Sequence, residues 1–359
     1  MTGKPRLPLD LAALETWLAP RLPGAIGLRA QQFSGGQSNP TYRLEGQGGA
    51  WVLRRKPPGT LLPKAHMIER EYRVMAALGA EGFPVPAMRL YCEDASVIGA
   101  PFYVMDFVTG RVVFDTTLPG LTPEARRTTY ESAIDTLAAL HRLDWREVGL
   151  GDFGREGGYL GRQIAVWSRQ YAASTEEPLP AMTALATQLE QAVARIPDEI
   201  CLVHGDYRLD NLILHPERPE VLAVLDWELS TLGNPLADLG YFLMTWVFPQ
   251  GLRYGLAGAD LVALGIPTLE ALAARYAEQT GRQAVGDLDL LLAFNIFRIA
   301  AILAGVQARA RAGNAADANA EVLGADVPHL AEIGLEYARR AGVGAPNGVQ
   351  TKGSAHDRT

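Results

Sequence analysis

Three oxygen-bearing side chains stand at a spacing that suits phosphoryl transfer. Asp206 comes shortly after an apolar run, Asn211 lies five residues further on, and Asp226 follows after another fifteen, at the end of a second apolar run. An aspartate can accept a proton from a substrate hydroxyl, while an asparagine and another aspartate can hold Mg²⁺ against nucleotide phosphates. We therefore predict Asp206 as a catalytic base, and Asn211 and Asp226 as metal ligands.

Each of these residues also has a simpler explanation on its own. Asp206 could cap a surface turn, Asn211 could hydrogen-bond its own backbone, and Asp226 could cap a helix. Their combination favours chemistry, because apolar runs before Asp206, after Asn211 and before Asp226 predict a strand and a hairpin. Such an arrangement would bring the three side chains to the mouth of one hairpin.

Two further residues of this loop could assist. Arg208, two positions after Asp206, is a candidate catalytic cation that would neutralise charge on the transferring phosphoryl group. Its alternative is a solvated loop arginine. His204 follows apolar residues, and bracing of the loop is favoured over direct catalysis. Asp210 has no assigned role.

A glycine-rich turn near the N-terminus is a candidate phosphate grip. Glycines let backbone amides approach phosphates closely, and the Ser and Asn side chains can donate hydrogen bonds. Two Gly in a row are also an ordinary hairpin turn, and here the turn separates two predicted strands. The predicted nucleotide-binding turn comprises Ser34, Gly35, Gly36, Gln37, Ser38 and Asn39.

Arg54 ends the next strand-like run and would carry a cation to the phosphates. Glu71, in a predicted helix, is its expected partner, with Glu69 as a competitor. Arg55 and Lys56 compete with Arg54, but strand alternation turns Arg55 to the opposite face. The alternative is a helix whose charged residues are simply solvated.

A later apolar strand ends near Met105 and Phe107. The backbone from Met105 to Val108 is where an adenine could hydrogen-bond, so both residues are predicted nucleotide contacts. An ordinary core strand is the alternative for any single side chain.

The order of elements predicts an α+β fold with two lobes. Short strands with one internal helix fill residues 1–107, which predicts a small β-rich N-terminal lobe. Helical periodicity dominates residues 108–342 and predicts a larger, mostly helical C-terminal lobe carrying the catalytic loop and the substrate pocket. The polar, Gly-rich residues 343–359 are expected to be disordered.

Composition narrows the class of protein. The chain has 359 residues, 48% of them hydrophobic and 20% charged, with a net charge of −7. Such acidity argues against nucleic acid as a partner. Two distant cysteines and an N-terminus without an apolar stretch predict a cytoplasmic location. The apolar segment Leu290 to Val306 contains Asn295 and Arg298, so we expect a buried helix and no membrane partner.

Taken together, these residues resemble the aminoglycoside-phosphotransferase-like kinase superfamily, which is related to choline kinases and more distantly to protein kinases. The resemblance runs from about Phe33 to Arg311, and HGDYRLDN with LDWE is its most specific part. It implies a bilobal, protein-kinase-like fold with ATP and Mg²⁺ as cofactors. It also implies Asp206 as catalytic base and a small-molecule hydroxyl as acceptor.

A narrower branch, associated with acyl-CoA dehydrogenases, is similar in further segments. The segments are FSGGQSNPTYRL, WVLRRKPPG, LLPKAHMIEREYRVMAAL, FYVMDFVTGRV, YLGRQIAVWSRQY and LDWELSTLGNPLADLGY. This resemblance implies phosphorylation of a hydroxyl on a hydroxyacyl-CoA. The family often has Lys where this chain has Arg54, whose fork geometry differs from a point charge. Antibiotic phosphorylation and a catalytically silent nucleotide-binding module are the rival hypotheses, and the oligomeric state is left open.

Overall fold

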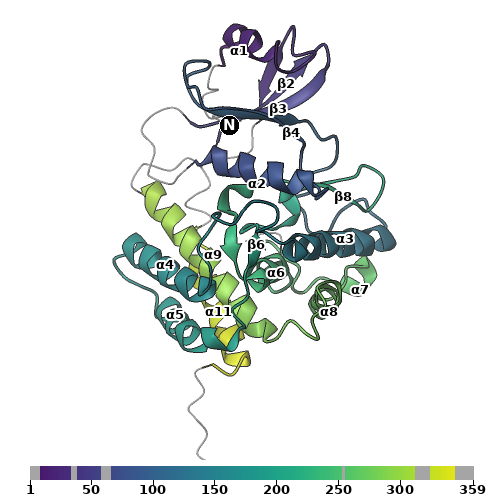
Figure 1. Cartoon of the computed structure of the whole chain (residues 1–359). Helices are drawn as coiled ribbons and strands as arrows, with labels where there is room; N and C mark the ends of the chain where they lie inside the picture. The colour runs from purple at the N-terminus through teal and green to yellow at the C-terminus, as the bar shows by residue number, and fades with distance from the viewer. Residues whose placement is uncertain (1–8, 34–38, 58–65, 253–254, 312–323, 344–359) are drawn as a thin grey trace, which may run out of the picture. The chain divides into compact units, whose positions relative to one another are not determined.

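The structure is a computed structural model, and it describes residues 9–33, 39–57, 66–252, 255–311 and 324–343 (Figure 1). The chain divides into two compact units. One unit comprises Met1–Tyr159 and Asp198–Val285, and the other comprises Leu160–Pro197 and Gly286–Thr359.

The first unit contains a five-stranded antiparallel sheet in the order β1-β2-β3-β5-β4. Successive side chains of a strand point to opposite faces, and the central strands β3 and β5 bury residues on both faces. In β2 the residues alternate between partly and fully buried. The strands are β1 (Arg29–Gln32), β2 (Thr41–Gly46), β3 (Gly49–Arg55), β4 (Met88–Cys92) and β5 (Phe102–Asp106).

The two faces of this sheet differ in chemistry. Trp51, Leu53 and Phe102 belong to an apolar core that also includes Leu14 and Leu18 of helix α1 (Leu11–Leu18). Residues two apart on a strand point to the same face, and on the opposite face these residues include polar side chains. Thr41 pairs with Arg54, which pairs with Tyr103, so one polar row crosses three strands.

Helix α2 (Ile68–Ala80) follows β3 and contacts β4 and β5. Ile68, Val74 and Leu78 supply its buried apolar stripe at helical spacing. Glu71 is buried on the same helix with only 1% of its surface exposed. A carboxylate in that position needs partners, because burying a charge without compensation is costly.

The second part of the first unit holds two short strand pairs. The predicted hairpin is confirmed as β7 (Leu212–Leu214) and β8 (Val221–Val224), which are antiparallel. A second pair, β6 (Cys201–Val203) with β9 (Thr231–Gly233), was not predicted. Helices around them are α3 (Pro123–Arg142), α6 (Pro235–Leu243), α7 (Leu261–Leu264) and α8 (Leu269–Gln279). Short 3-10 turns are η2 (Leu209–Asn211), η3 (Trp227–Leu229) and η4 (Met244–Trp246).

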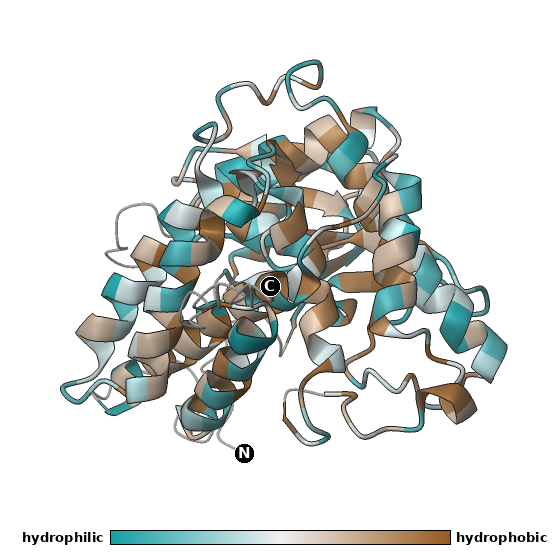
Figure 2. Ribbon diagram, turned by 90° about the horizontal axis from the view of Figure 1, so that it is seen from below, coloured by the Kyte–Doolittle hydropathy of each residue, from teal (hydrophilic) through white to brown (hydrophobic). Residues whose placement is uncertain are grey.

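The second unit is helical. Helix α11 packs against both α5 and α9. Figure 2, coloured by hydropathy, shows that the helices of the chain carry both hydrophobic and hydrophilic residues. Among the described residues one helix, α9, is long and apolar enough to cross a membrane, but 83% of its most apolar window is buried. The expected buried helix is therefore confirmed, with Asn295 and Arg298 inside it. The elements are α4 (Tyr159–Ser174), α5 (Pro180–Ala192), η1 (Val193–Arg195), α9 (Leu288–Arg311) and α11 (Val327–Arg340).

The predicted α+β class is confirmed by the small antiparallel sheet followed by a mostly helical remainder. The predicted lobe boundary at residues 107 and 108 stays a prediction. Two predicted features fall mostly outside the described residues: the turn from Ser34 to Asn39, of which only Asn39 is described, and the tail, of which only Val343 is described.

Candidate active site

The loop between β6 and β7 holds Asp206 and is braced by His204. The Asp206 backbone N–H donates to His204 Nδ1 at 3.1 Å, and His204 Nε2 lies 2.8 Å from the Leu225 carbonyl oxygen. Because Nδ1 accepts a hydrogen bond, Nε2 carries the ring proton and donates it to Leu225. The buried imidazole thus joins the Asp206 loop to the strand end that precedes Asp226, as the bracing role requires.

Asp238 of α6 fixes the same loop through its backbone. Its carboxylate accepts the His204 N–H at 2.6 Å and the Gly205 N–H at 2.9 Å. Its Oδ2 also lies 3.4 Å from His141 Nε2, and His141 Nδ1 lies 2.6 Å from Tyr276 Oη. Burial alone would raise the pKa of Asp238, but the hydrogen bond from His141, the favourable electrostatics of the two histidines and the hydrogen bond from the Gly205 N–H hold it below its ordinary value.

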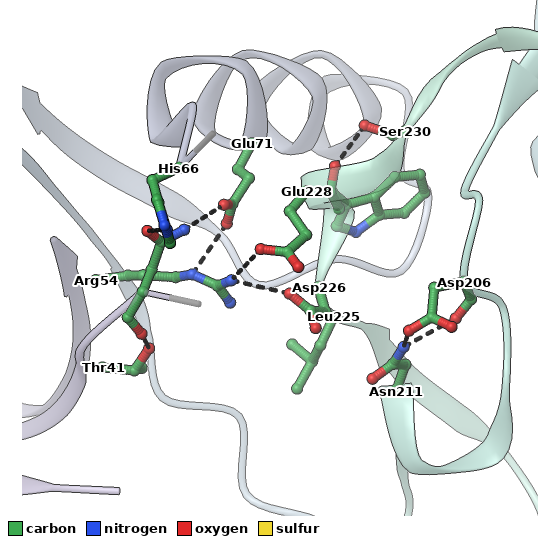
Figure 3. Close-up of polar contacts among 12 residues, drawn as sticks. Thr41, Arg54, His66, Glu71, Asp206, Asn211, Leu225, Asp226, Glu228 and Ser230 are labelled. Atoms are coloured by element: carbon green, nitrogen blue, oxygen red, sulfur yellow. Dashed lines mark hydrogen bonds and ion pairs between the residues drawn. The ribbon is translucent and has the colours of Figure 1, made fainter. Parts of the chain in front are cut away.

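Asn211 and Arg208 both contact the Asp206 carboxylate. Asn211 Nδ2 donates to the Asp206 carbonyl oxygen at 2.8 Å and to Asp206 Oδ2 at 3.0 Å (Figure 3). Arg208 Nε lies 3.2 Å from the same Oδ2, and Arg208 Nη1 lies 2.8 Å from Asp210 Oδ2. Asp210, to which the sequence assigned no role, therefore contacts the same arginine as Asp206.

Asp226 lies at the end of the β7–β8 hairpin in an unusual backbone conformation. Its φ of 65° and ψ of 60° are left-handed, which Asp tolerates better than most side chains, and η3 begins directly after it. The Leu225 N–H donates to the Asn211 carbonyl oxygen at 2.8 Å. This bond ties the segments of the two predicted metal ligands to each other.

Arg54 lies among three carboxylates. Glu71 is its expected partner, whereas contacts with Asp226 and Glu228 were not predicted. Arg54 Nη2 donates to Asp226 Oδ1 at 2.9 Å and lies 3.6 Å from Glu228 Oε2 (Figure 3). Its Nε lies 3.1 Å from Glu71 Oε2, an ionic contact that lacks the angle of a hydrogen bond. Burial would lower the pKa of Arg54, but Tyr103 and the three carboxylates raise it above its ordinary value.

Glu71 is held by three groups. Asn39 Nδ2 donates to Oε1 at 2.9 Å and Tyr103 Oη donates to Oε2 at 3.0 Å, in addition to the Arg54 contact. Burial raises the pKa of Glu71 to about 7, against the lowering effect of Arg54 and with a further rise from Asp226 and Glu228. Predicted nucleotide residue Asn39 therefore supports the Arg54–Glu71 pair.

The competing assignments for this pair are resolved. Arg54 contacts Glu71, whereas Lys56 pairs with Glu69 at 3.0 Å. Arg55 lies on the opposite face, is 6% exposed and donates to the Ile98 carbonyl oxygen.

The predicted adenine contacts lie on β5 and just beyond it. Met105 pairs with Val52 across the sheet and is buried. The Phe107 N–H donates to the Ala50 carbonyl oxygen at 3.3 Å, so this particular donor is engaged within the sheet. Their nucleotide role stays a prediction.

Sequence reasoning missed Glu228, Asp238 and Tyr103. A signal existed for the two acids, because Glu228 follows Asp226 by two residues and Asp238 is a lone charge in an apolar helix. Nothing in the sequence marked Tyr103. Within the described ranges no three His, Cys, Asp or Glu side chains group as a metal site of their own.

Comparison with known proteins places this geometry in a family. Residues 29–293 match the model of the phosphotransferase enzyme family. Acyl-CoA dehydrogenase family member 11 of Rattus norvegicus is 41% identical over 94% of this chain, which spans 44% of that relative. A crystal structure from Ralstonia eutropha JMP134, provisionally an aminoglycoside phosphotransferase, is 46% identical with a TM-score of 0.84 and covers 93% of this chain and 99% of its own.

A more distant solved structure shares the fold alone. A thermostable mutant of aminoglycoside phosphotransferase APH(4)-Ia, in ternary complex with AMP-PNP and hygromycin B, is 14% identical with a TM-score of 0.61. It covers 93% of this chain and 99% of its own. The family match spans well over half of the residues, and with the kinase-like fold it shows that this chain belongs to the phosphotransferase enzyme family.

Proposed function

We propose that this chain is an ATP- and Mg²⁺-dependent kinase that transfers the γ-phosphoryl group to a hydroxyl of a small molecule, namely a hydroxyacyl-CoA. The observation that carries the proposal is the meeting of Asp206, Asn211 and Asp226 beside Arg54. A base, two oxygen ligands and a buried cation are the parts that phosphoryl transfer needs.

The residues present suit Mg²⁺. The amide nitrogen of Asn211 donates hydrogen bonds to Asp206, which leaves the carbonyl oxygen of its side chain for a hard cation. Asp226 supplies a charged carboxylate next to it. Mg²⁺ keeps several waters and takes few protein ligands, so two oxygens and the phosphates are sufficient. When bound, the ion would neutralise charge on the nucleotide phosphates.

Asp206 would orient the acceptor hydroxyl and take its proton. The described contacts of its carboxylate fall on Oδ2, so Oδ1 is the oxygen that can accept from the substrate. Arg208 then acts on the base by fixing its carboxylate, with Asp210 sharing the charge. Positioning of this kind supplies most of the catalysis in a reaction with a loose transition state.

Arg54 would hold the phosphates, with Glu71 setting its position. The Arg54 side chain is 14% exposed and its guanidinium already points at Asp226, so phosphates arriving with the metal would meet a cation that is largely desolvated. Low local dielectric strengthens that contact. The adenine would lie along the backbone from Met105 to Val108, and the turn from Ser34 to Asn39 would cover the phosphates.

A CoA ester is proposed as acceptor because of the relative named acyl-CoA dehydrogenase family member 11. That protein carries a segment 41% identical to this chain in less than half of its length. A segment like this chain within a protein named as an acyl-CoA dehydrogenase family member favours a shared substrate class. Phosphorylation of a hydroxyacyl-CoA would give a phosphate ester, in which phosphate is a leaving group for later formation of an enoyl-CoA.

The test is ADP release by the purified protein with Mg-ATP and a panel of hydroxyacyl-CoAs, with Asp206→Asn as control. Turnover that requires both the hydroxyl and Asp206 would support the proposal. The matching acyl-CoA without a hydroxyl should give only the background rate. Equal ADP release with and without the hydroxyl would refute transfer to that group.

Antibiotic phosphorylation is the second candidate. The 46% identical structure from Ralstonia eutropha favours it, since that protein is described as an aminoglycoside phosphotransferase. An aminoglycoside panel in the same assay separates the two candidates. Nucleotide binding without ADP release on either panel would instead favour a silent nucleotide-binding module.

A further inference from the structure

Arg43 of β2 lies on the same face of the sheet as Arg54. Arg43 pairs with Val52, and Val52 pairs with Met105 on β5. Side chains that face each other across neighbouring strands share one face. The row Arg43–Val52–Met105 therefore lies beside the row that contains Arg54, one step along the sheet.

The guanidinium of Arg43 already stacks on a ring. Its Cζ lies 4.5 Å from the centroid of Phe107, which directly follows β5. Arg43 Nη2 lies 2.9 Å from Glu45 Oε1, and this contact restrains the plane of the guanidinium. Arg43 Nε is buried and has no hydrogen-bond partner among the described residues. This cation is thus placed by Glu45 and Phe107, with one donor unused.

We propose that Arg43 is a nucleobase-binding residue, whose guanidinium stacks on the face of the base next to Val52 and Met105. This inference rests on the proposed function, because it takes the phosphates to lie at Arg54. A base joined to those phosphates reaches the neighbouring row of the same sheet face. A planar guanidinium stacks well on flat rings, and the π-face that it uses is common to all bases.

The test separates the base from the phosphates. Binding of AMP-PNP and of inorganic tripolyphosphate, both with Mg²⁺, is measured by calorimetry for the wild type and for Arg43→Met. We expect the affinity for AMP-PNP to fall about tenfold, because stacking on the base is lost. The affinity for tripolyphosphate should change less than about twofold, since exposed charges at a distance are screened.

Two further variants serve as controls. Arg43→Lys keeps the charge but not the plane, so it should lose most of the AMP-PNP affinity that Arg43→Met loses. Arg29→Met removes an equal charge from the neighbouring strand, where Arg29 lies 3.8 Å from the same Glu45, and should leave both affinities unchanged. Thermal unfolding of each variant checks that the fold is kept.

The outcomes are distinct. Equal losses for AMP-PNP and tripolyphosphate would mean that Arg43 acts on phosphate charge, and unchanged AMP-PNP binding would mean that it does not meet the base. Either result overturns the inference and leaves the proposed kinase function standing. If the wild type binds neither compound, the proposed function itself fails, and the inference fails with it.

Discussion

The loop around Asp206 and the cluster around Arg54 are both partly buried, yet they are held in different ways. The loop is fixed through its backbone, since the N–H groups of His204 and Gly205 both donate to Asp238. Arg54 is fixed by side-chain charges alone, from Glu71, Asp226 and Glu228. The loop geometry therefore survives a change of charge at Asp206, whereas the Arg54 geometry depends on the ionisation of its neighbours.

This difference suits the two tasks. A base must stay within hydrogen-bonding reach of a hydroxyl, and backbone ties give that precision. Under the proposed function, Arg54 would have to exchange partners, because Asp226 would turn from Arg54 to the metal when a nucleotide binds. Ionic contacts with partly exposed carboxylates permit such exchange, since each contributes little free energy.

The largest effect is expected at the base. Asp206→Asn should lower kcat by about 10³-fold, because the amide cannot accept the proton of the hydroxyl. Nucleotide affinity and the thermal midpoint should stay near the wild-type values, since the loop is tied by Asp238 and not by Asp206. Steady-state ADP release and a thermal scan check both parts. A normal rate would remove Asp206 from the role of base.

The next effect concerns the backbone tie. Asp238→Asn should reduce the free energy of unfolding by about 3 kcal/mol. The amide NH₂ would face a backbone N–H group whose hydrogen bond the carboxylate now accepts. Asp135→Asn is the matched control, since Asp135 pairs with Arg275 at the surface and is 39% exposed. Its loss should be under about 1 kcal/mol. Urea midpoints measure both, and similar losses would contradict a special role for Asp238.

A smaller effect is expected at Arg54. Arg54→Lys should raise KM for Mg-ATP by about tenfold, because a single ammonium cannot reproduce the fork that spans Glu71 and Asp226. The thermal midpoint should change little. Lys56→Met, which removes a neighbouring cation paired with Glu69, is the control and should leave KM within about twofold. An unchanged KM in Arg54→Lys would show that charge alone suffices.

The smallest effect is a pH dependence that belongs to the Arg54 side only. Glu71 faces Arg54, Asn39 and Tyr103, with Asp226 and Glu228 beyond, and its pKa is about 7. As the pH falls through that value, Glu71 takes up a proton and its ion pair with Arg54 is lost. We expect kcat/KM to fall on the acid side, and Glu71→Gln to flatten that limb. An identical acid limb in the variant would assign it to another group.

Folding stability should move in the opposite direction. The pKa of Glu71 rises from 4.5 to about 7 in the folded protein, so between these values the folded state binds a proton that the unfolded chain has released. The contribution of Glu71 to stability therefore increases as pH falls from about 7 to 4.5 and is lost as pH rises through that window. Urea midpoints of wild type and Glu71→Gln across this range measure the difference, and its sign is the check.

Much of the fold could be predicted from local patterns. The β7–β8 hairpin was predicted from two apolar runs on either side of a polar turn, and α2 from apolar residues at helical spacing. The strand pair β6–β9 was missed because β9 is only three residues long and its partner lies 28 residues earlier. Short strands carry no periodicity of their own, and their pairing is a long-range contact.

The sequence by itself determined which residue types could do chemistry, because apolar runs that predict strands stand before Asp206, after Asn211 and before Asp226. Strand alternation also placed Arg54 and Arg55 on opposite faces, since the period of a strand is two. Only the tertiary structure decided the partners: Glu71 over Glu69, Glu228 beside Arg54, and Asp238 beneath the loop. Those choices depend on burial and on contacts between distant segments, which local sequence does not encode.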